Sequence, residues 1–411
     1  MAIRADMLVM NCTRLLTLAG PSRPRIGDEM NDLGEVESGA VVITDGKILE
    51  TGPAEQLNAK YDCPQRINAA EGIIMPGLVD CHTHAIFLRP RADELAQRAA
   101  GVPYLDILAA GGGIYSTVRS VLAAGREHLR WETQNRLDAM LAHGTTTVEI
   151  KSGYGLNLET ERKMLQIAGF LDRRHPMDIV ATFLGAHVVP ENMDRAAYVD
   201  FLVDEALGEL KGLAEFCDVF CDAEAFTLDE ARRIFSAALE QGYKLKIHAG
   251  QFTDMGAAGL AAEFGAVSAD HLEHVSDEQL AQMHDCGTLA VLLPGAALYL
   301  MSETYADARR MIDAGVPVAV ATDFNPGSCP CFSMQMMISL ACLKLKLTPA
   351  EAVTAATINA AYALDRGDRV GSLEPGKQAD LIIVNTIDER ELACHFGVNN
   401  VRTVIKAGKV V

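Results

Sequence analysis

Eight short apolar runs, separated by helical patterns, most constrain the fold of this 411-residue chain. Each run ends in polar residues, as buried strands of an α/β protein do. This alternation predicts a parallel TIM-like (β/α)8 barrel. A doubly wound sheet, the main alternative, usually has a glycine-rich turn after its first strand, whereas His-Thr-His follows here. The runs cover 73–81, 145–150, 179–186, 216–221, 244–248, 266–270, 288–293 and 317–322.

Helical patterns lie between these runs. The segment 159–174 has apolar residues at helical spacing, and 227–240 and 276–285 each open with the spacing of a capping box. A fourth segment, 348–365, begins Thr-Pro-Ala-Glu, with proline where the first turn of a helix tolerates it. All four segments fit helices that cover the outside of a barrel.

The two ends of the chain differ from its middle. Residues 1–66 and 366–411 contain short strand patterns with turn signals, and we interpret them as β-hairpins without helices. We therefore predict that 1–66 and 366–411 together form a small β-sandwich domain. Residues 67–365 then form the barrel.

Charge and composition exclude several classes of function. The formal net charge is -19, and without a local basic patch so acidic a chain is not expected to bind nucleic acid or an anionic membrane. No apolar run reaches the roughly 18 residues of a membrane helix, and the N-terminus lacks the pattern of a signal peptide. The ten cysteines are scattered without a C-x-x-C pair, which is typical of a reduced compartment. We expect a cytoplasmic protein.

The polar residues at the strand ends predict a metal site, because that face of a barrel carries the active site. His82 and His84 follow the first run, His248 ends the fifth and Asp323 follows the eighth. Side chains alternate along a strand, so His-x-His places both imidazoles on one face. Three imidazoles and a carboxylate suit Zn²⁺ or Fe²⁺. Further polar residues after strands are Tyr154, His187 and His271.

We expect one metal ion rather than two. A binuclear site of this architecture needs a bridging anion, usually a modified lysine or a glutamate from the fourth strand. The fourth run, 216–221, contains no lysine. Lys151 follows the second run, and we interpret it as a surface lysine or a substrate contact.

Local strings in the chain resemble a known family. The segment GLVDCHTHA (77–85), with the polar strand-end residues and the tail GSLEPGKQADLIIV (371–384), is similar to the amidohydrolase superfamily. More specific strings resemble the imidazolonepropionase family, the ring-opening hydrolases of histidine degradation. These strings are GGGIYSTVRS (111–120), TTTVEIKSGYGL (145–156), HAGQF (248–252), SADHLEH (268–274) and DFNPGSCP (323–330).

The resemblance implies a role for each matching residue. His82, His84, His248 and Asp323 match the metal ligands, and His271 matches the histidine beside the reacting carbonyl. The residues that match substrate contacts are Arg91, Tyr154, His187, Gln251, Asn325, Gly327 and Ser328. The family usually has a Gly-rich stretch before the arginine that Arg91 matches, whereas residues 87–90 here read Phe-Leu-Arg-Pro. The spacing from His82 favours Arg91, and Arg89 is a second candidate.

The implied reaction is the hydrolytic ring opening of 4-imidazolone-5-propanoate to N-formimino-L-glutamate. One Zn²⁺ or Fe²⁺/Fe³⁺ ion per subunit would lower the pKa of water from 15.7 to roughly 7. Asp323 would shuttle the proton, His271 would stabilise the oxyanion and the arginine would bind the substrate carboxylate. The alternatives are a deaminase or another cyclic amidohydrolase, and a silent barrel that only assembles with partners. The resemblance is compatible with a homodimer.

Overall fold

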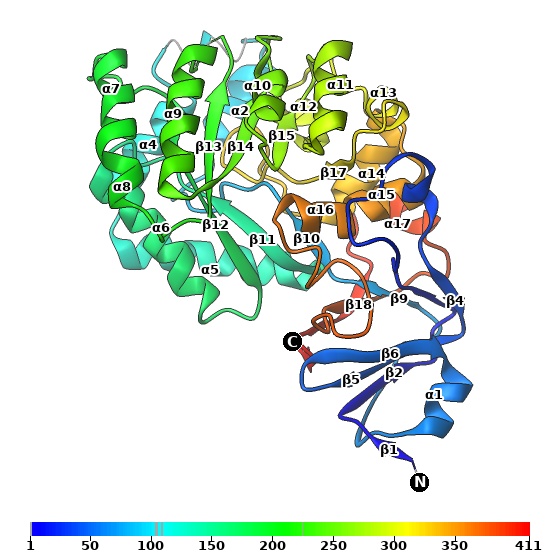
Figure 1. Cartoon of the computed structure of the whole chain (residues 1–411). Coiled ribbons are helices and arrows are strands. Elements are labelled where there is room, and N and C mark those ends of the chain that lie inside the picture. Colours follow the sequence, from blue (N-terminus) through cyan, green and yellow to red (C-terminus); the bar gives the residue numbers. More distant parts are fainter. Residues whose placement is uncertain (1, 103–105, 108–109, 224) are drawn as a thin grey trace.

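The computed structural model describes residues 2–102, 106–107, 110–223 and 225–411. Eight strands form one parallel sheet in chain order, which confirms the predicted barrel. In Figure 1 this sheet lies in the upper part of the molecule with helices around it. The strands are β10 (Leu78–Asp80), β11 (Thr145–Lys151), β12 (Asp178–Ala186), β13 (Phe216–Cys221), β14 (Lys244–Ala249), β15 (Ser268–His271), β16 (Leu289–Leu292) and β17 (Val318–Val320).

The two outer strands of this sheet, β10 and β17, meet just beyond their carboxyl ends. Thr83 and Phe324 form a parallel bridge there. The amide of Asp323 donates a hydrogen bond to the carbonyl of His82 over 3.0 Å. Nearby, the amide of Thr322 donates to the Asp80 carboxylate over 3.0 Å. These bonds join the first and last strands of the barrel beside His82, His84 and Asp323, which the sequence analysis predicts as metal ligands.

Helices cover the outside of the barrel. The predicted capping box at Thr227 is present, because Thr227 and Glu230 each accept a hydrogen bond from the other's backbone amide. The one predicted at Ser276 forms in part: the Ser276 hydroxyl accepts from the amide of Gln279, whereas the Gln279 side chain donates to Asp254. The predicted helix over 348–365 is instead two helices, separated at 356–357. The helices of the barrel are α2 (Ala92–Ala99), α4 (Ile114–Ala123), α5 (Arg126–Ala142), α6 (Leu158–Asp172), α7 (Arg195–Phe201), the π-helix η2 (Leu202–Ala206), α8 (Leu207–Glu209), α9 (Leu228–Gln241), α10 (Ala257–Glu263), α11 (Asp277–Cys286), α12 (Pro294–Tyr299), α13 (Ala308–Asp313), α14 (Met334–Leu345), α15 (Pro349–Ala355) and α16 (Ile358–Ala363).

Both ends of the chain build additional sheets. A six-stranded sheet has the order β20-β19-β18-β9-β3-β4, and a four-stranded sheet has the order β6-β5-β2-β8. The blue and red segments lie together in the lower right of Figure 1. The strands are β1 (Ile3–Arg4), β2 (Met7–Met10), β3 (Arg14–Leu16), β4 (Glu35–Glu37), β5 (Gly39–Thr44), β6 (Lys47–Pro53), β7 (Tyr61–Asp62), β8 (Gln65–Asn68), β9 (Ile73–Pro76), β18 (Leu381–Val384), β19 (Val401–Lys406) and β20 (Lys409–Val410).

These terminal segments also contain helices, contrary to the expectation of plain hairpins. They are the 3-10 helix η1 (Gly27–Asn31), α1 (Ala54–Lys60) and α17 (Arg390–Cys394). A buried apolar cluster joins strands from both ends, with Val9, Ile43, Leu381 and Ile405 among its members. The boundaries at 66 and 365 stay predictions.

The predicted first strand, 73–81, divides between two sheets. Its first part, β9, pairs with β18 and β3 of the six-stranded sheet. Its second part, β10, pairs with β11 of the barrel. Gly77 lies at the division, where an added Cβ would be 2.3 Å from Oγ1 of Thr146. The strand therefore passes the start of β11 only because this residue has no side chain.

In the described part of the chain, no helix combines the length and the apolar character that crossing a bilayer requires. All ten cysteines are free. Eight of them are buried or partly buried, as expected of small apolar residues, whereas Cys286 and Cys394 are exposed. The cytoplasmic location and the homodimer stay predictions.

Candidate metal centre and active site

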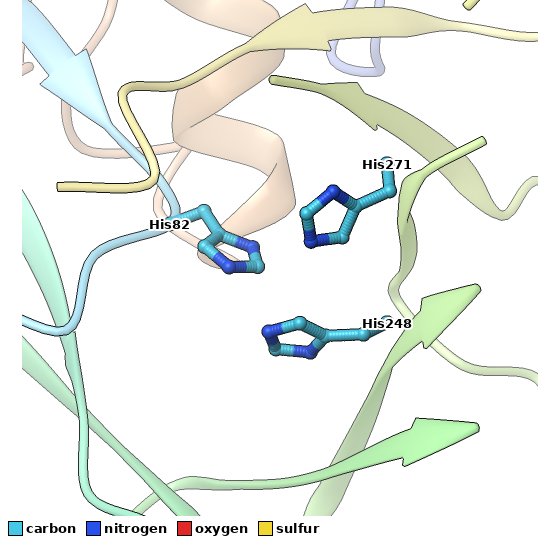
Figure 2. Close-up of side chains that lie close together, drawn as sticks. All are labelled: His82, His248 and His271. Atoms are coloured by element: carbon cyan, nitrogen blue, oxygen red, sulfur yellow. The ribbon is translucent and has the colours of Figure 1, made fainter. Parts of the chain in front are cut away.

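Three histidines from different strands converge at the carboxyl end of the barrel. His82 follows β10, His248 lies in β14 and His271 ends β15. Figure 2 shows their imidazole rings turned toward a common space. The ring centroids of His82 and His248 are 4.6 Å apart, and those of His248 and His271 are 5.3 Å apart. The register of the parallel strands thus brings together residues far apart in the sequence.

Two groups of side chains have donor atoms close enough to share one ion. One group is His82, His84 and Asp323, the other is His82, His248 and His271, and in each group the donor atoms lie within 4.8 Å of one another. Oδ1 of Asp323 is 3.6 Å from Nε2 of His82 and 3.5 Å from Nε2 of His84. All of these side chains are buried. Imidazole and carboxylate donors at this spacing suit a divalent transition metal.

Several imidazole nitrogens in this cluster have no hydrogen-bond partner. Nε2 of His82, Nε2 of His248, Nδ1 of His84 and Nδ1 of His271 are buried and unpartnered in the described chain. Such atoms are costly to bury unless something else binds them. Burial lowers the pKa of His82, His84 and His271 well below the ordinary value, so they are neutral, as metal ligands must be. The cluster therefore fits a divalent metal ion.

The structure places His271 beside the other histidines. It contributes a donor atom to the second group. Its backbone has φ +81°, a left-handed conformation that is uncommon outside glycine. Its Nδ1 lies 3.9 Å from Oε2 of Glu273, a buried carboxylate. His271 is therefore positioned to contact either the metal or the substrate.

Lys151 is a correction to the sequence analysis. Its side chain is fully buried inside the barrel and lines neither the surface nor the pocket. Nζ is 2.6 Å from Oδ2 of Asp218 and 2.8 Å from Oε2 of Glu149. Burial alone would lower the pKa of Lys151, but these carboxylates and Asp270 outweigh it and raise that pKa. Lys151 is a charged residue of the barrel interior, and the strand period places it there beside Glu149.

A pocket opens above the histidines. Most of the predicted site residues line it. His82 and Gly327 do not, although Gly327 packs against the side chain of Arg91. Burial lowers the pKa of His187 to about 3, so this imidazole is neutral. Apolar side chains such as Ile114, Phe220 and Leu300 complete the wall. The predicted residues in the lining are His84, Arg91, Tyr154, His187, His248, Gln251, His271, Asp323, Asn325 and Ser328.

The position of Arg91 favours it over Arg89 as the anion-binding residue. The Arg91 side chain is 7% exposed and faces the pocket, whereas Arg89 is exposed and does not line it. Nε and Nη1 of Arg91 have no hydrogen-bond partner in the described chain. The nearest carboxylate, Oε2 of Glu94, is 3.7 Å from Nη1. A buried guanidinium with free N–H groups is a ready site for a carboxylate.

The loop after β17 contains Asp323 and packs against Arg91 on one side of the pocket. Oδ1 of Asn325 accepts hydrogen bonds from the amides of Gly327 and Ser328 at 2.8 and 2.7 Å. The hydroxyl of Ser328 donates to Oδ2 of Asp323 over 3.3 Å. Burial raises the pKa of the Asp323 carboxyl to about 7. Asn325 and Ser328 therefore line the pocket and also position Asp323, the candidate catalytic residue.

The sequence analysis missed two buried carboxylates that shape the pocket. Glu161, in the first turn of α6, accepts hydrogen bonds from the amides of Gly153, Gly155 and Leu156 and so holds the loop that carries Tyr154. Asp222, directly after β13, accepts from the amide of Phe252, next to Gln251. Asp222 could have been found as the polar residue that ends the fourth run. Nothing local in the sequence marks Glu161.

Comparison with known protein sequences identifies a family and full-length relatives of this chain. The amidohydrolase family profile matches residues 73–411. An imidazolonepropionase from Geobacillus kaustophilus is 49% identical over 416 residues, covering 98% of this chain and 97% of the relative. An imidazolonepropionase from Alkaliphilus metalliredigens is 45% identical over 412 residues, covering 99% and 98%. These relatives match the chain over nearly its whole length.

Solved structures share the fold at lower identity. An adenosine deaminase from Xanthomonas campestris with bound zinc has a TM-score of 0.77 at 20% identity, covering 100% of this chain and 93% of the deaminase. Escherichia coli guanine deaminase has a TM-score of 0.75 at 17% identity, covering 98% of each chain. The barrel, the buried histidine cluster and the full-length relatives agree. The chain therefore belongs to the amidohydrolase family and, within it, to the imidazolonepropionases.

Proposed function

We propose that the chain catalyses the hydrolytic ring opening of 4-imidazolone-5-propanoate to N-formimino-L-glutamate. The observation that carries the proposal is the placement of Arg91. Its buried guanidinium faces the same pocket as His84, His248 and Asp323. A small ring with a propionate tail can therefore place its carboxylate on the arginine and its carbonyl at the histidine cluster. The names of the full-length relatives support the same substrate.

His82, His84, His248 and Asp323 would hold one Zn²⁺ or Fe²⁺/Fe³⁺ ion per subunit. The four residues supply nitrogen and oxygen donors, and their unpartnered imidazole nitrogens support the assignment. Both metals accept this donor set. A bound ion would polarise the ring carbonyl and lower the pKa of water to roughly 7.

Substrate binding would divide between the two sides of the pocket. Arg91 would bind the propionate by charge-assisted hydrogen bonds, with Asn325, Gly327 and Ser328 forming the loop around it. Tyr154 and His187 would contact the ring from the opposite side. Their ring centroids lie 5.9 and 5.0 Å from that of His84, so both reach the reacting end of the pocket. Gln251 lines the pocket beside them.

Asp323 would act as the proton shuttle. Its carboxylate would accept a proton from the attacking water and deliver it to the ring nitrogen as the amide C–N bond breaks. The oxygen of water becomes part of the new carboxylate, so the reaction consumes one water and needs no other reactant. The neutral His271 would donate a hydrogen bond to the oxygen that gains negative charge.

The proposal is tested with freshly generated 4-imidazolone-5-propanoate beside a panel of purines and cytosine. We expect rapid loss of the imidazolone substrate and no turnover of the panel. Arg91→Ala should raise KM about tenfold or more, because a charge-assisted hydrogen bond contributes about 1.5–3 kcal/mol. Arg89→Ala is the matched control and should leave KM unchanged. Turnover of a purine, with none of the imidazolone substrate, would overturn the proposal.

A further inference from the structure

A cluster of five buried charged residues lies in the barrel beneath the histidines. It contains two lysines and three carboxylates whose side chains are fully buried: Lys151, Lys246, Glu149, Asp218 and Asp270. None of them lines the pocket. None takes part in the proposed proton transfers. Burying five charges is costly unless each is paired, so their arrangement requires an explanation.

Two of these carboxylates join the lysine to the histidines. Oδ1 of Asp218 accepts a hydrogen bond from Nδ1 of His248 at 3.1 Å, while its Oδ2 accepts from Nζ of Lys151 at 2.6 Å. Oδ2 of Asp270 accepts from Nδ1 of His82 at 2.6 Å and lies 3.7 Å from the same Nζ. One ammonium group thus contacts both carboxylates that orient the histidines.

The contacts fix which nitrogen of each imidazole faces the centre. With Nδ1 bound to a carboxylate, His82 and His248 present Nε2, and both Nε2 atoms are without a hydrogen-bond partner in the described chain. Partners of this kind set the tautomer and orientation of metal-binding histidines. His82 follows β10 and His248 lies in β14, so a single lysine in β11 connects opposite parts of the barrel.

We propose that Lys151 is a positioning residue of the metal centre, because it holds Asp218 and Asp270 against His248 and His82. The inference rests on the proposed metal site. Lys151 does not line the pocket, and it acts only through the two carboxylates. The arrangement explains why a lysine directly after the second apolar run is buried rather than exposed.

Electrostatics alone predicts the opposite effect for loss of this lysine. An ammonium group repels a cation, so removing its charge should tighten metal binding. A positioning role predicts weaker binding, because the carboxylates and their histidines lose their fixed geometry. The sign of the change therefore separates the two explanations.

Lys246 provides a matched control within the same cluster. It is equally buried, and its Nζ contacts Oε1 of Glu149 at 3.0 Å and the carbonyl of Cys81 at 3.1 Å. In the described chain it has no hydrogen bond or ion pair with Asp218 or Asp270. Lys246→Met therefore removes a buried charge without removing a hydrogen bond or ion pair of either orienting carboxylate.

The experiment measures metal binding by metal-stripped wild type, Lys151→Met and Lys246→Met, using Zn²⁺ in competition with a chromophoric chelator. We expect the Kd for Zn²⁺ to rise about 10- to 100-fold in Lys151→Met. In Lys246→Met it should stay at or below the wild-type value. The visible absorption of bound Co²⁺, which reports ligand geometry, should change only in Lys151→Met. Far-UV circular dichroism of the metal-free proteins checks that each variant folds.

Asp218→Asn keeps the test decisive if Lys151→Met does not fold, because it preserves shape and still offers an acceptor to His248. It should also weaken Zn²⁺ binding, and the double variant should lose less than the sum of the two single losses. Wild-type affinity in Lys151→Met, wild-type affinity in Asp218→Asn where Lys151→Met does not fold, or an equal loss in Lys246→Met would overturn the positioning role. Failure of the wild type to bind Zn²⁺ or Fe²⁺ would instead overturn the proposed metal centre.

Discussion

At the scale of single residues, Gly327 and Arg91 are in closer contact than a side chain at position 327 would allow. A Cβ built on Gly327 would lie 1.6 Å from Nη2 of Arg91. We predict that Gly327→Ala displaces the guanidinium and raises KM about tenfold or more, since the substrate carboxylate loses charge-assisted hydrogen bonds. Steady-state kinetics with 4-imidazolone-5-propanoate measure this change.

Gly52→Ala is the control for a glycine without such a neighbour. Among the residues that the structure describes, nothing lies within 4 Å of a Cβ at this position in β6. Its KM and melting temperature should match the wild type. An unchanged KM in Gly327→Ala would contradict the placement of Arg91 as the carboxylate anchor.

The histidines at the strand ends could be predicted from sequence because strand periodicity and barrel geometry determine where they point. The burial of Lys151 could not be predicted, since its partners Asp218 and Asp270 lie on two other strands. The choice between Arg89 and Arg91 likewise depends on how the loop after β10 packs. The local sequence pattern therefore identifies the predicted metal ligands, whereas tertiary packing decides which charged side chains orient them.

At the scale of elements, the loop between β11 and α6 is folded around one carboxylate. Amides of Gly153, Gly155 and Leu156 converge on Glu161, at distances of 2.7 to 3.0 Å. Glu161→Gln replaces one acceptor oxygen by a donor, which leaves a buried amide unpaired at a cost of about 1–3 kcal/mol. We predict a lower melting temperature and a KM several-fold higher, because Tyr154 lies on this loop.

Glu159→Gln is the matched control, since Glu159 lies in the same helical turn but is exposed. It should leave both the melting temperature and KM unchanged. Equal behaviour of the two variants would show that the loop does not depend on the buried carboxylate. The same loop needs a glycine at position 155, because a Cβ there would be 2.6 Å from the amide nitrogen of Glu161.

Most element types could be predicted from sequence, but the divisions within two of them were not. The run 73–81 is predicted as one strand, although it contains the break signal Pro76-Gly77, and the chain passes from one sheet to the other at this pair. The segment 348–365 has a continuous helical pattern. It divides because Thr357 has φ -130° and ψ -95°, outside the helical region.

At the scale of the whole molecule, Lys406 connects the terminal sheets to the barrel. Its Nζ is 2.6 Å from Oδ2 of Asp380 and 2.8 Å from Oδ2 of Asp178, the first residue of β12. Lys406→Met leaves these carboxylates without their cation, and removing one partner of a buried pair costs about 3–5 kcal/mol. We predict reduced stability to denaturant. KM should be unchanged, because the pair lies at the end of the barrel away from the pocket.

Lys409→Met is the control, since Lys409 is exposed on the next strand. It should unfold at the wild-type denaturant concentration. A large rise in KM in Lys406→Met would show that the terminal sheets influence the pocket. The overall architecture was predictable because eight repeats of one strand–helix pattern leave few other folds. The strand order of the terminal sheets was not, because it depends on contacts that no local pattern records.

The central claim is that a metal ion held by the histidine and aspartate cluster supports ring opening. The most direct test strips the metal with a chelator and restores it with Zn²⁺ or Fe²⁺, measuring metal content and turnover of 4-imidazolone-5-propanoate on the same sample. The account predicts that activity disappears, returns in proportion to bound metal and saturates at about one ion per chain, with Asp323→Ala inactive throughout. Undiminished turnover by metal-free protein, or none at full occupancy, would contradict it.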